Sequence, residues 1–507
     1  MEILSREIPL FKTVFCGEID RETEKELSLP DYCPDITRLI RVDATPYIEG
    51  CFATGNKCTV NGTYVFTVLY ESDFNSALSF CSFPISFTES VDVNDAGNES
   101  RVSAKMNTRR IGCKMINPRK FTLRVKSGLS LSVKRIERKG IADVTSLPEK
   151  VYVKKDTIKW TEKSEAKVYE FPFKERYPLA DKAASIDDVV MTSFTAEKPE
   201  CTVTENGTVL KTAVTAKLLY CSEDDKDKYI MSTNRIPVTV NIDDVYGDGV
   251  SVDAEAMVSK TEISVDVDQY GENRIIEASF TLKVTACEER KVTAEYATDG
   301  FASEQCGIAV TESFETLAES QRINRVFSAE VRFVPEEIHF TELCDHSARV
   351  NECRIKADES GTTLYGTYTV SVLGRGESGY QSFDHISAFE EKISADKITF
   401  DDCDIRCDVF EANALLASDG SISVRIMCRA EIIAEKTVTV NAVTDIKAVE
   451  CEKEKCSVIF CYPAARDDLW SIAKRYFASP EAILSDNPEV FDGVGNIVAR
   501  TPVRITK

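Results

Sequence analysis

Thiol and imidazole groups are the side chains in this sequence best suited to nucleophilic or metal chemistry. The 507 residues include 18 cysteines but only three histidines, His339, His346 and His385. The closest cysteine spacings do not form the paired C-x2-C pattern of zinc sites. They are Cys403 with Cys407, and the run Cys451, Cys456 and Cys461. No base stands at a recognisable spacing from any thiol, so the pattern predicts no metal centre, no catalytic cysteine and no bound cofactor.

Two carboxylates, Asp31 and Asp35, lie in the segment Leu29-Pro-Asp-Tyr-Cys-Pro-Asp-Ile36. Paired carboxylates can act as general acid and base, but no histidine or nucleophile lies near them in the sequence. The two prolines fix φ angles, and the two aspartates can accept hydrogen bonds from neighbouring N–H groups. The segment therefore predicts a rigid turn and not an active site.

A glycine pattern, Gly374-Arg-Gly-Glu-Ser-Gly379, matches the G-x-G-x-x-G spacing of dinucleotide-binding loops. Such a loop needs a helix directly after it, because the helix N-terminus receives the pyrophosphate. The residues that follow Gly379 do not begin a helix. We therefore predict an ordinary polar turn between two strands.

The composition predicts an ordered, acidic protein. There are 62 basic and 84 acidic side chains, giving a formal net charge of −22, and 43% of residues are hydrophobic. This balance disfavours nucleic acid or anionic lipid as the main partner. The N-terminus lacks the apolar stretch of a secretory signal, and no segment has the length and hydrophobicity of a membrane span. We expect a cytoplasmic location, where most cysteines are free thiols.

A repeat of about 150 residues shows in the strand patterns. Apolar residues alternate with period two along three matching segments, which is typical of strands with one face on a core. These are the segments beginning at Gly62, Lys211 and Gly366, in which Leu69, Leu219 and Leu373 occupy matching positions on the opposite face. We predict a mainly β fold with three tandem sandwich- or barrel-like modules. Their predicted ranges are residues 1–165, 166–300 and 301–445.

The last segment, residues 455–507, changes from strand to helix patterns. A short strand ending at Tyr462 precedes a helix capped by Asp467 or Asp468, whose apolar residues recur at helical spacing as far as Tyr476. A second helix begins at Ser479-Pro480. A closing strand then gives the order strand, helix, helix, strand (βααβ).

The first module resembles the SPOCS domain of SipL-type spore coat morphogenesis proteins from endospore-forming Firmicutes. The resemblance rests on the segment Leu29 to Ile36, the strand Gly62 to Tyr70, and Ile116-Asn-Pro-Arg-Lys120. The second and third modules lack the first and last of these motifs, so they resemble diverged copies.

The C-terminal segment resembles a LysM domain through Asp467 to Tyr476 and the later Asn487-Pro488. LysM domains usually bind N-acetylglucosamine-containing glycans in a shallow groove between two loops. Here the usual Gly-Asp-Thr of the first loop is Arg466-Asp467-Asp468. This change removes a flexible glycine and a compact hydroxyl, so we expect weak glycan binding at most.

The SipL resemblance implies a non-enzymatic adaptor in the mother-cell cytoplasm at the outer forespore surface. Such proteins bind the coat-basement ATPase (SpoIVA-like) through the LysM domain, and other coat proteins are further candidate partners. The predicted partner-binding residues are Arg466, Asp467, Asp468, Trp470, Asn487 and Pro488. Trp470 suits a protein contact, a sugar platform or a core position. The alternatives are a peptidoglycan-binding LysM protein and an enzyme that uses one of the thiols.

Overall fold

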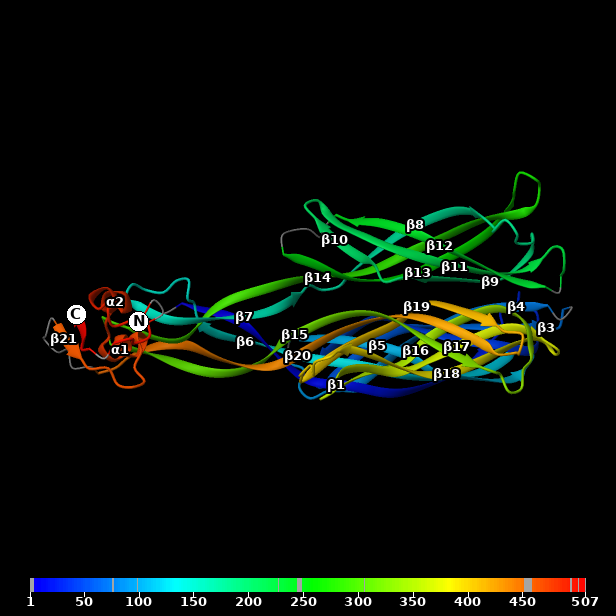
Figure 1. The fold of residues 1–507 in the computed structure, drawn as a ribbon. Helices are drawn as coiled ribbons and strands as arrows, with labels where there is room; N and C mark the ends of the chain where they lie inside the picture. Colours follow the sequence, from blue (N-terminus) through cyan, green and yellow to red (C-terminus); the bar gives the residue numbers. More distant parts are fainter. Residues whose placement is uncertain are drawn as a thin grey trace.

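The computed structural model describes residues 4–74, 77–97, 99–226, 228–243, 249–304, 306–450, 458–492, 495–499 and 501–506. Most of these residues lie in β-strands, which confirms the predicted mainly β fold. The only helices in these ranges are α1 (Leu469–Tyr476) and α2 (Pro480–Asp486). The molecule is elongated, with both helices at one end and broad strand-rich lobes at the other (Figure 1).

The first six strands form two antiparallel sheets of three strands each. One sheet has the order β1–β6–β5, and the other has the order β2–β3–β4. Their bounds are β1 (Ser5–Ser28), β2 (Ile36–Thr54), β3 (Lys57–Ser72), β4 (Leu78–Asp92), β5 (Ser100–Asn117) and β6 (Lys120–Ala142). One hydrophobic core contains buried residues from both sheets, so this unit is a β-sandwich.

The core of this sandwich follows the period-two pattern of β3. Tyr64, Phe66 and Val68 are each 1% exposed or less, whereas the residues between them are half-buried. They pack in one cluster with Leu123 and Leu129 of the facing β6. Burying side chains of this size stabilises the fold by about 1.5–3 kcal/mol each.

The next eight strands repeat this arrangement. Their bounds are β7 (Val151–Lys163), β8 (Lys167–Pro178), β9 (Ile186–Ala196), β10 (Glu200–Thr204), β11 (Gly207–Ser222), β12 (Tyr229–Ile242), β13 (Val250–Val267) and β14 (Asn273–Ala302). Strands β7 and β8 both pair with β14, and β9 and β10 both pair with β11. Each pair therefore takes the place of one unbroken strand of the first set. The predicted boundary at residue 165 falls between β7 and β8.

The last six long strands again form the two sheet orders of the first set, β15–β20–β19 and β16–β17–β18. Their bounds are β15 (Gly307–Phe333), β16 (Phe340–Asp358), β17 (Gly361–Gly376), β18 (Gly379–Ser394), β19 (Asp402–Leu416) and β20 (Ile422–Ala448). The glycine pattern lies at the β17–β18 hairpin, with Gly376 paired to Gly379, whose φ is +87°. The predicted turn is therefore confirmed at this position.

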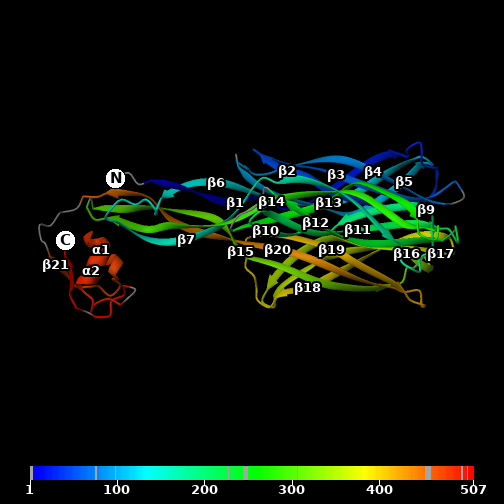
Figure 2. The ribbon, with the colours of Figure 1, turned by 90° about the horizontal axis from the view of Figure 1, so that it is seen from above.

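The three strand sets share cores with one another. The long pairs β1–β6, β7–β14 and β15–β20 all contribute to one hydrophobic cluster. Its members include Phe11, Ile141, Trp160, Tyr296, Leu317 and Val440. Strands β14, β15 and β20 extend from the lobes toward the C-terminal helices (Figures 1 and 2). The sets therefore form one fused body and not a string of separate beads.

A second shared core lies beside the β3–β4, β11–β12 and β17–β18 hairpins. Leu69, Leu219 and Leu373, the matched leucines of the sequence repeat, meet in one buried cluster. Beside them, the Leu78 N–H donates to the Tyr229 hydroxyl at 3.0 Å, and the Tyr229 N–H donates to the Tyr380 hydroxyl at 3.1 Å. Both bonds span 151 residues, so matching positions of the three sets are linked in turn.

A buried ion network also joins all three sets. Asp345 of β16 accepts from Arg41 of β2 at 2.9 Å and from Lys217 of β11 at 3.1 Å. Its side chain is only 4% exposed. Burial opposes ionisation of Asp345, but the two cations outweigh burial and lower the pKa of this carboxyl.

The C-terminal unit has the order β21 (Val458–Cys461), α1, α2 and β22 (Val503–Thr506), with β21 and β22 antiparallel. Asp468 caps α1 by accepting from the Ser471 N–H at 2.7 Å, while the Ser471 hydroxyl accepts from the Asp468 N–H at 2.8 Å. Ser479 caps α2, and Pro480 occupies its first turn. The inner faces of the helices and strands share one hydrophobic core.

Candidate binding surfaces

The C-terminal unit is docked on the end of β14. Phe301 of that strand is 0% exposed and belongs to the same hydrophobic cluster as the inner residues of the helices. Its ring centroid lies 5.3 Å from that of Trp470 and 6.5 Å from that of Phe477. A residue of the second strand set therefore completes the core of the C-terminal unit.

Asp299, two residues before Phe301, fixes the orientation of α1. Its carboxylate accepts a hydrogen bond from the Trp470 indole N–H at 2.9 Å and pairs with the Lys474 ammonium at 2.6 Å. Burial opposes ionisation of Asp299, but these two donors outweigh burial and lower its pKa. Lys154 of β7, the register partner of Asp299, lies 5.6 Å from the centroid of the Trp470 ring. The indole is thus held by two adjacent strands of another unit.

The predicted acidic loop is used to shape the C-terminal unit. Asp467 accepts from the Ala464 N–H at 2.9 Å and pairs with Arg475 at 2.5 Å. Arg475 holds the pKa of Asp467 below its ordinary value. Asp468 caps α1 and lies 3.6 Å from Lys154, so its carboxylate also contributes to docking. Burial opposes ionisation of Asp468, but the Ser471 N–H and hydroxyl together with Lys154 lower its pKa.

The other predicted residues divide between structure and surface. Asn487 is buried, and its amide donates to the carbonyls of Ile483 and Arg504 at 2.7 Å each. The Arg504 N–H donates back to the Asn487 side chain at 2.8 Å, so this residue joins α2 to β22. Arg466 and Pro488 are exposed. Asp467, Asp468 and Trp470 thus lie together at the start of α1, whereas Asn487 is bonded to β22.

Sequence reasoning missed the exposed aromatic residues of the C-terminal unit. Phe460 is 66% exposed and Tyr462 is 78% exposed, whereas Cys461 between them is buried. The signal was present as period-two alternation in the short strand, in which Ile459 and Cys461 face the core. These rings give the unit an apolar surface that the contact with β14 leaves open.

The turn between β1 and β2 is the predicted rigid turn, and an arginine clamps it. Arg119 donates to the carbonyls of Pro30 and Cys33 at 2.9 and 3.1 Å, and to the Asp35 carboxylate at 2.6 Å. The Tyr70 hydroxyl donates to the Pro34 carbonyl at 3.0 Å. The conformation of the turn is therefore set by side chains from the β5–β6 turn and from β3.

A second copy of this clamp, which sequence reasoning missed, lies between β8 and β9. Arg274 donates to the carbonyls of Ala183 and, at 2.8 Å, Ala180. The Tyr220 hydroxyl donates to the Ala184 carbonyl at 3.0 Å. The signal was the shared spacing Leu-x-Asp-x-x-x-x-Ile, which begins at Leu179 here and 150 residues earlier in the first copy.

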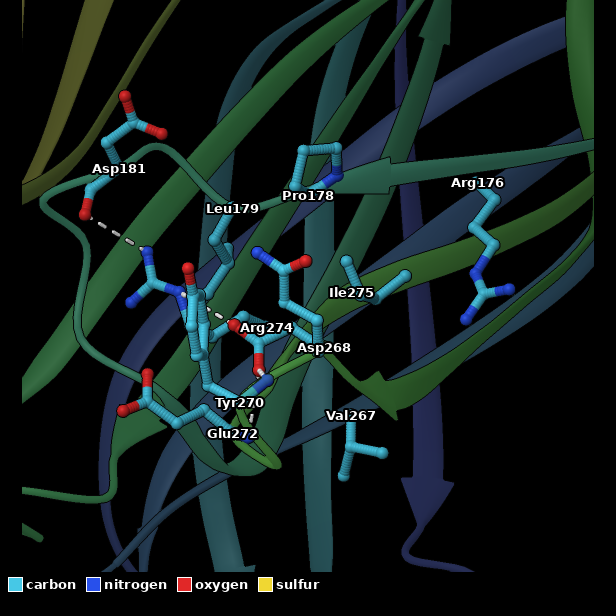
Figure 3. A pocket seen from close by; sticks show the side chains of 11 residues that line it. Arg176, Pro178, Leu179, Asp181, Val267, Asp268, Tyr270, Glu272, Arg274 and Ile275 are labelled. Atoms are coloured by element: carbon cyan, nitrogen blue, oxygen red, sulfur yellow. Dashed lines mark hydrogen bonds and ion pairs between the residues drawn. The ribbon is translucent and has the colours of Figure 1, made fainter.

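A cavity of about 650 Å³ lies beside this second clamp, where the β13–β14 turn covers it (Figure 3). Asp268 accepts from the N–H groups of Tyr270 and Glu272 at 2.8 and 3.1 Å, and Figure 3 shows the Tyr270 ring near Arg274. None of the residues that line the cavity is a cysteine, a histidine or a serine. These hydrogen bonds hold the turn together.

Three thiols of the third strand set lie together: Cys407 shares side-chain hydrogen bonds with Cys353 and Cys428, which lower the pKa of Cys407 and raise the pKa of the other two. Within the described ranges, no group of three or more His, Cys, Asp or Glu side chains is placed to hold a metal ion. Burial raises the pKa of Cys344 and of Cys403 to about 12, which keeps these thiols protonated. Fifteen described cysteines are free, whereas Cys306 is disulfide-bonded. Cys451 and Cys456 lie outside the described residues.

Comparison with known proteins gives one family match. Residues 35–116 match the family model described as SipL, SPOCS domain. The matched range runs from the end of the clamped turn through β2, β3 and β4 and almost to the end of β5. No curated protein and no solved structure matches the chain. None of the described helices is long and apolar enough to cross a membrane.

Proposed function

Because this chain contains a SipL-type SPOCS domain, which links it to sporulation, we propose that it is a non-enzymatic adaptor in spore coat assembly. In this role it binds the coat-basement ATPase through its C-terminal LysM-like unit at the forespore surface. The family match is the observation on which the proposal rests. The fused strand sets support it, because they form one elongated body with the C-terminal unit at its end (Figure 1).

The docking of the C-terminal unit suggests how the partner contact is divided among the predicted residues. Trp470 and Asp468 already contact the second strand set, so we assign them the role of positioning the unit. Arg466 and Pro488 are exposed, and we assign these two residues to the contact with the ATPase. The exposed rings of Phe460 and Tyr462 extend the available apolar surface.

Binding of the purified full chain to the purified ATPase, measured by biolayer interferometry, tests this assignment. We expect Arg466→Ala and Phe460→Ala each to weaken binding several-fold with unchanged thermal stability. Glu481→Ala, an exposed change on α2, serves as the matched control. Unchanged binding by the Arg466→Ala, Phe460→Ala double variant would remove the assignment.

Peptidoglycan binding is the second candidate function, because the C-terminal unit has the strand–helix–helix–strand order of LysM domains. Two of the groove positions, Asp468 and Asn487, are occupied by hydrogen bonds within the unit. Titration calorimetry with a chitooligosaccharide separates the two functions. Tight sugar binding by the full chain favours the glycan function.

A further inference from the structure

Comparing the two clamped turns, β1–β2 and β8–β9, shows which residues the turn conformation requires. Both copies have the clamping arginine, Arg119 or Arg274, and the tyrosine hydroxyl bond, from Tyr70 or Tyr220. The second copy forms the turn with alanines where the first has prolines and a cysteine. At the outermost position the first copy has Tyr32 and the second has Lys182. An aromatic residue is therefore not needed to build the turn.

Tyr32 is 86% exposed on this firmly held turn. A second exposed aromatic ring lies next to the residue that is bonded to this turn. Phe74, 70% exposed, lies in the β3–β4 hairpin, and that hairpin is tied to the turn by the Asp73 N–H donating to the Asp35 carbonyl at 3.0 Å. Within the described part of the chain, neither ring has a hydrogen bond or an aromatic contact. The surface thus presents two exposed aromatic side chains, one on the clamped turn and one beside Asp73, which is hydrogen-bonded to that turn.

The charges around these rings are mostly negative. Asp31 is fully exposed, Asp73 is exposed, and the Asp35 side chain is 39% exposed. Arg119 is the cation of the clamp; it pairs with Asp35 at 2.6 Å and lies 4.0 Å from the Asp31 carboxylate, so one positive charge faces these two negative ones. Phosphate-bearing partners are disfavoured by this charge. A cationic side chain is favoured twice, by the carboxylates and by the faces of the rings.

We propose that the β1–β2 turn and the β3–β4 hairpin form a docking surface for a lysine- or arginine-rich polypeptide segment. Tyr32 and Phe74 receive the cations on their ring faces, and Asp31 and Asp73 supply the opposite charge. Because the clamp holds the turn before binding, little conformational entropy is lost when the segment docks. This surface belongs to the strand sets and is separate from the C-terminal unit, so it does not depend on the function proposed above.

A labelled deca-lysine peptide tests the proposal by fluorescence anisotropy with the full chain at 0.15 M salt. We expect Tyr32→Ala and Phe74→Ala each to raise Kd about threefold, and the double variant about tenfold. Tyr32→Phe keeps the ring face and should bind like the parent. Lys182→Ala, at the matching position of the second turn, should not weaken binding.

A second measurement addresses binding that comes from net charge alone. Benzoylphenylalanine in place of Tyr32 should cross-link to the peptide on illumination, and the same group in place of Lys182 should cross-link far less. All variants change exposed residues, so their thermal unfolding midpoints should match that of the parent. Equal Kd values for the parent and the Tyr32, Phe74 double variant would overturn the proposal. Equal cross-linking at the two positions, or no binding by the parent, would also overturn it.

Discussion

Removing the Asp299 carboxylate should loosen the docked C-terminal unit without unfolding the strand sets. Asp299→Ala deletes the hydrogen bond from Trp470 and the ion pair with Lys474. Hydrogen bonds to charged groups contribute about 1.5–3 kcal/mol. The Asp299 and Lys474 side chains remain 29% and 31% exposed, so solvent screening places the loss near the lower limit. A loss of about 1.5 kcal/mol is roughly a tenfold change in the docking equilibrium.

Tryptophan fluorescence reports this equilibrium directly. The chain has two tryptophans, and Trp160→Phe leaves Trp470 as the only indole. In that background, Asp299→Ala should shift the emission to longer wavelength and increase quenching by acrylamide, because the half-buried ring becomes exposed. Glu295→Ala, on the same strand and in an exposed pair with Lys155, is the matched control. Identical quenching in the Asp299 variant and the control would refute the docking role of this carboxylate.

The same reporter gives the expected pH dependence. The pKa of Asp299 is lowered in the folded protein, so its contribution is fully present above the ordinary aspartate pKa of about 3.9. The contribution is lost as the pH falls through the lowered value. Trp470 emission should therefore stay constant from pH 7 to 5 and shift only in more acidic solution. In the Asp299→Ala variant this acid shift should be smaller.

Two further changes test the fused arrangement of the strand sets, and a third tests the clamped turn. Leu219→Ala opens a cavity in the cluster shared by all three sets and should cost about 2–5 kcal/mol, measured by urea unfolding. Asp345→Ala leaves Arg41 and Lys217 without their shared buried partner and should cost about 3–5 kcal/mol in the same assay. Arg119→Ala should accelerate hydrogen exchange at the clamped turn, whereas Arg124→Ala, an exposed change on the adjoining strand β6, should not.

The local elements could be predicted from the sequence because their signals are local. Alternation in β3 identified the strand, and the expected caps, Asp467 or Asp468 for α1 and Ser479 for α2, identified the starts of both helices. The 150-residue repeat also identified the matching leucines. It did not reveal that Leu69, Leu219 and Leu373 meet, because a repeat shows which positions are equivalent and not where they lie in space.

The docking contact could not be predicted, because Trp470 and Asp299 are separated by 171 residues and neither has a local signal for the other. The predicted boundary at residue 165 follows a stretch of charged residues that begins at Lys154. The structure places this stretch in β7, where Ile158 and Trp160 face the shared core and the charged residues face outward. The first residues of this strand, Val151, Tyr152 and Val153, also pack against apolar clusters, but the charges that follow them obscured the pattern.

The central claim is that the C-terminal unit provides the contact with the coat-basement ATPase while the strand sets hold it in place. The most direct measurement compares ATPase binding by the full chain with binding by a chain that ends after residue 448. The predicted result is binding by the full chain and none by the shortened one, with the strand sets still folded by circular dichroism. Equal affinity of the two chains for the ATPase would contradict this account.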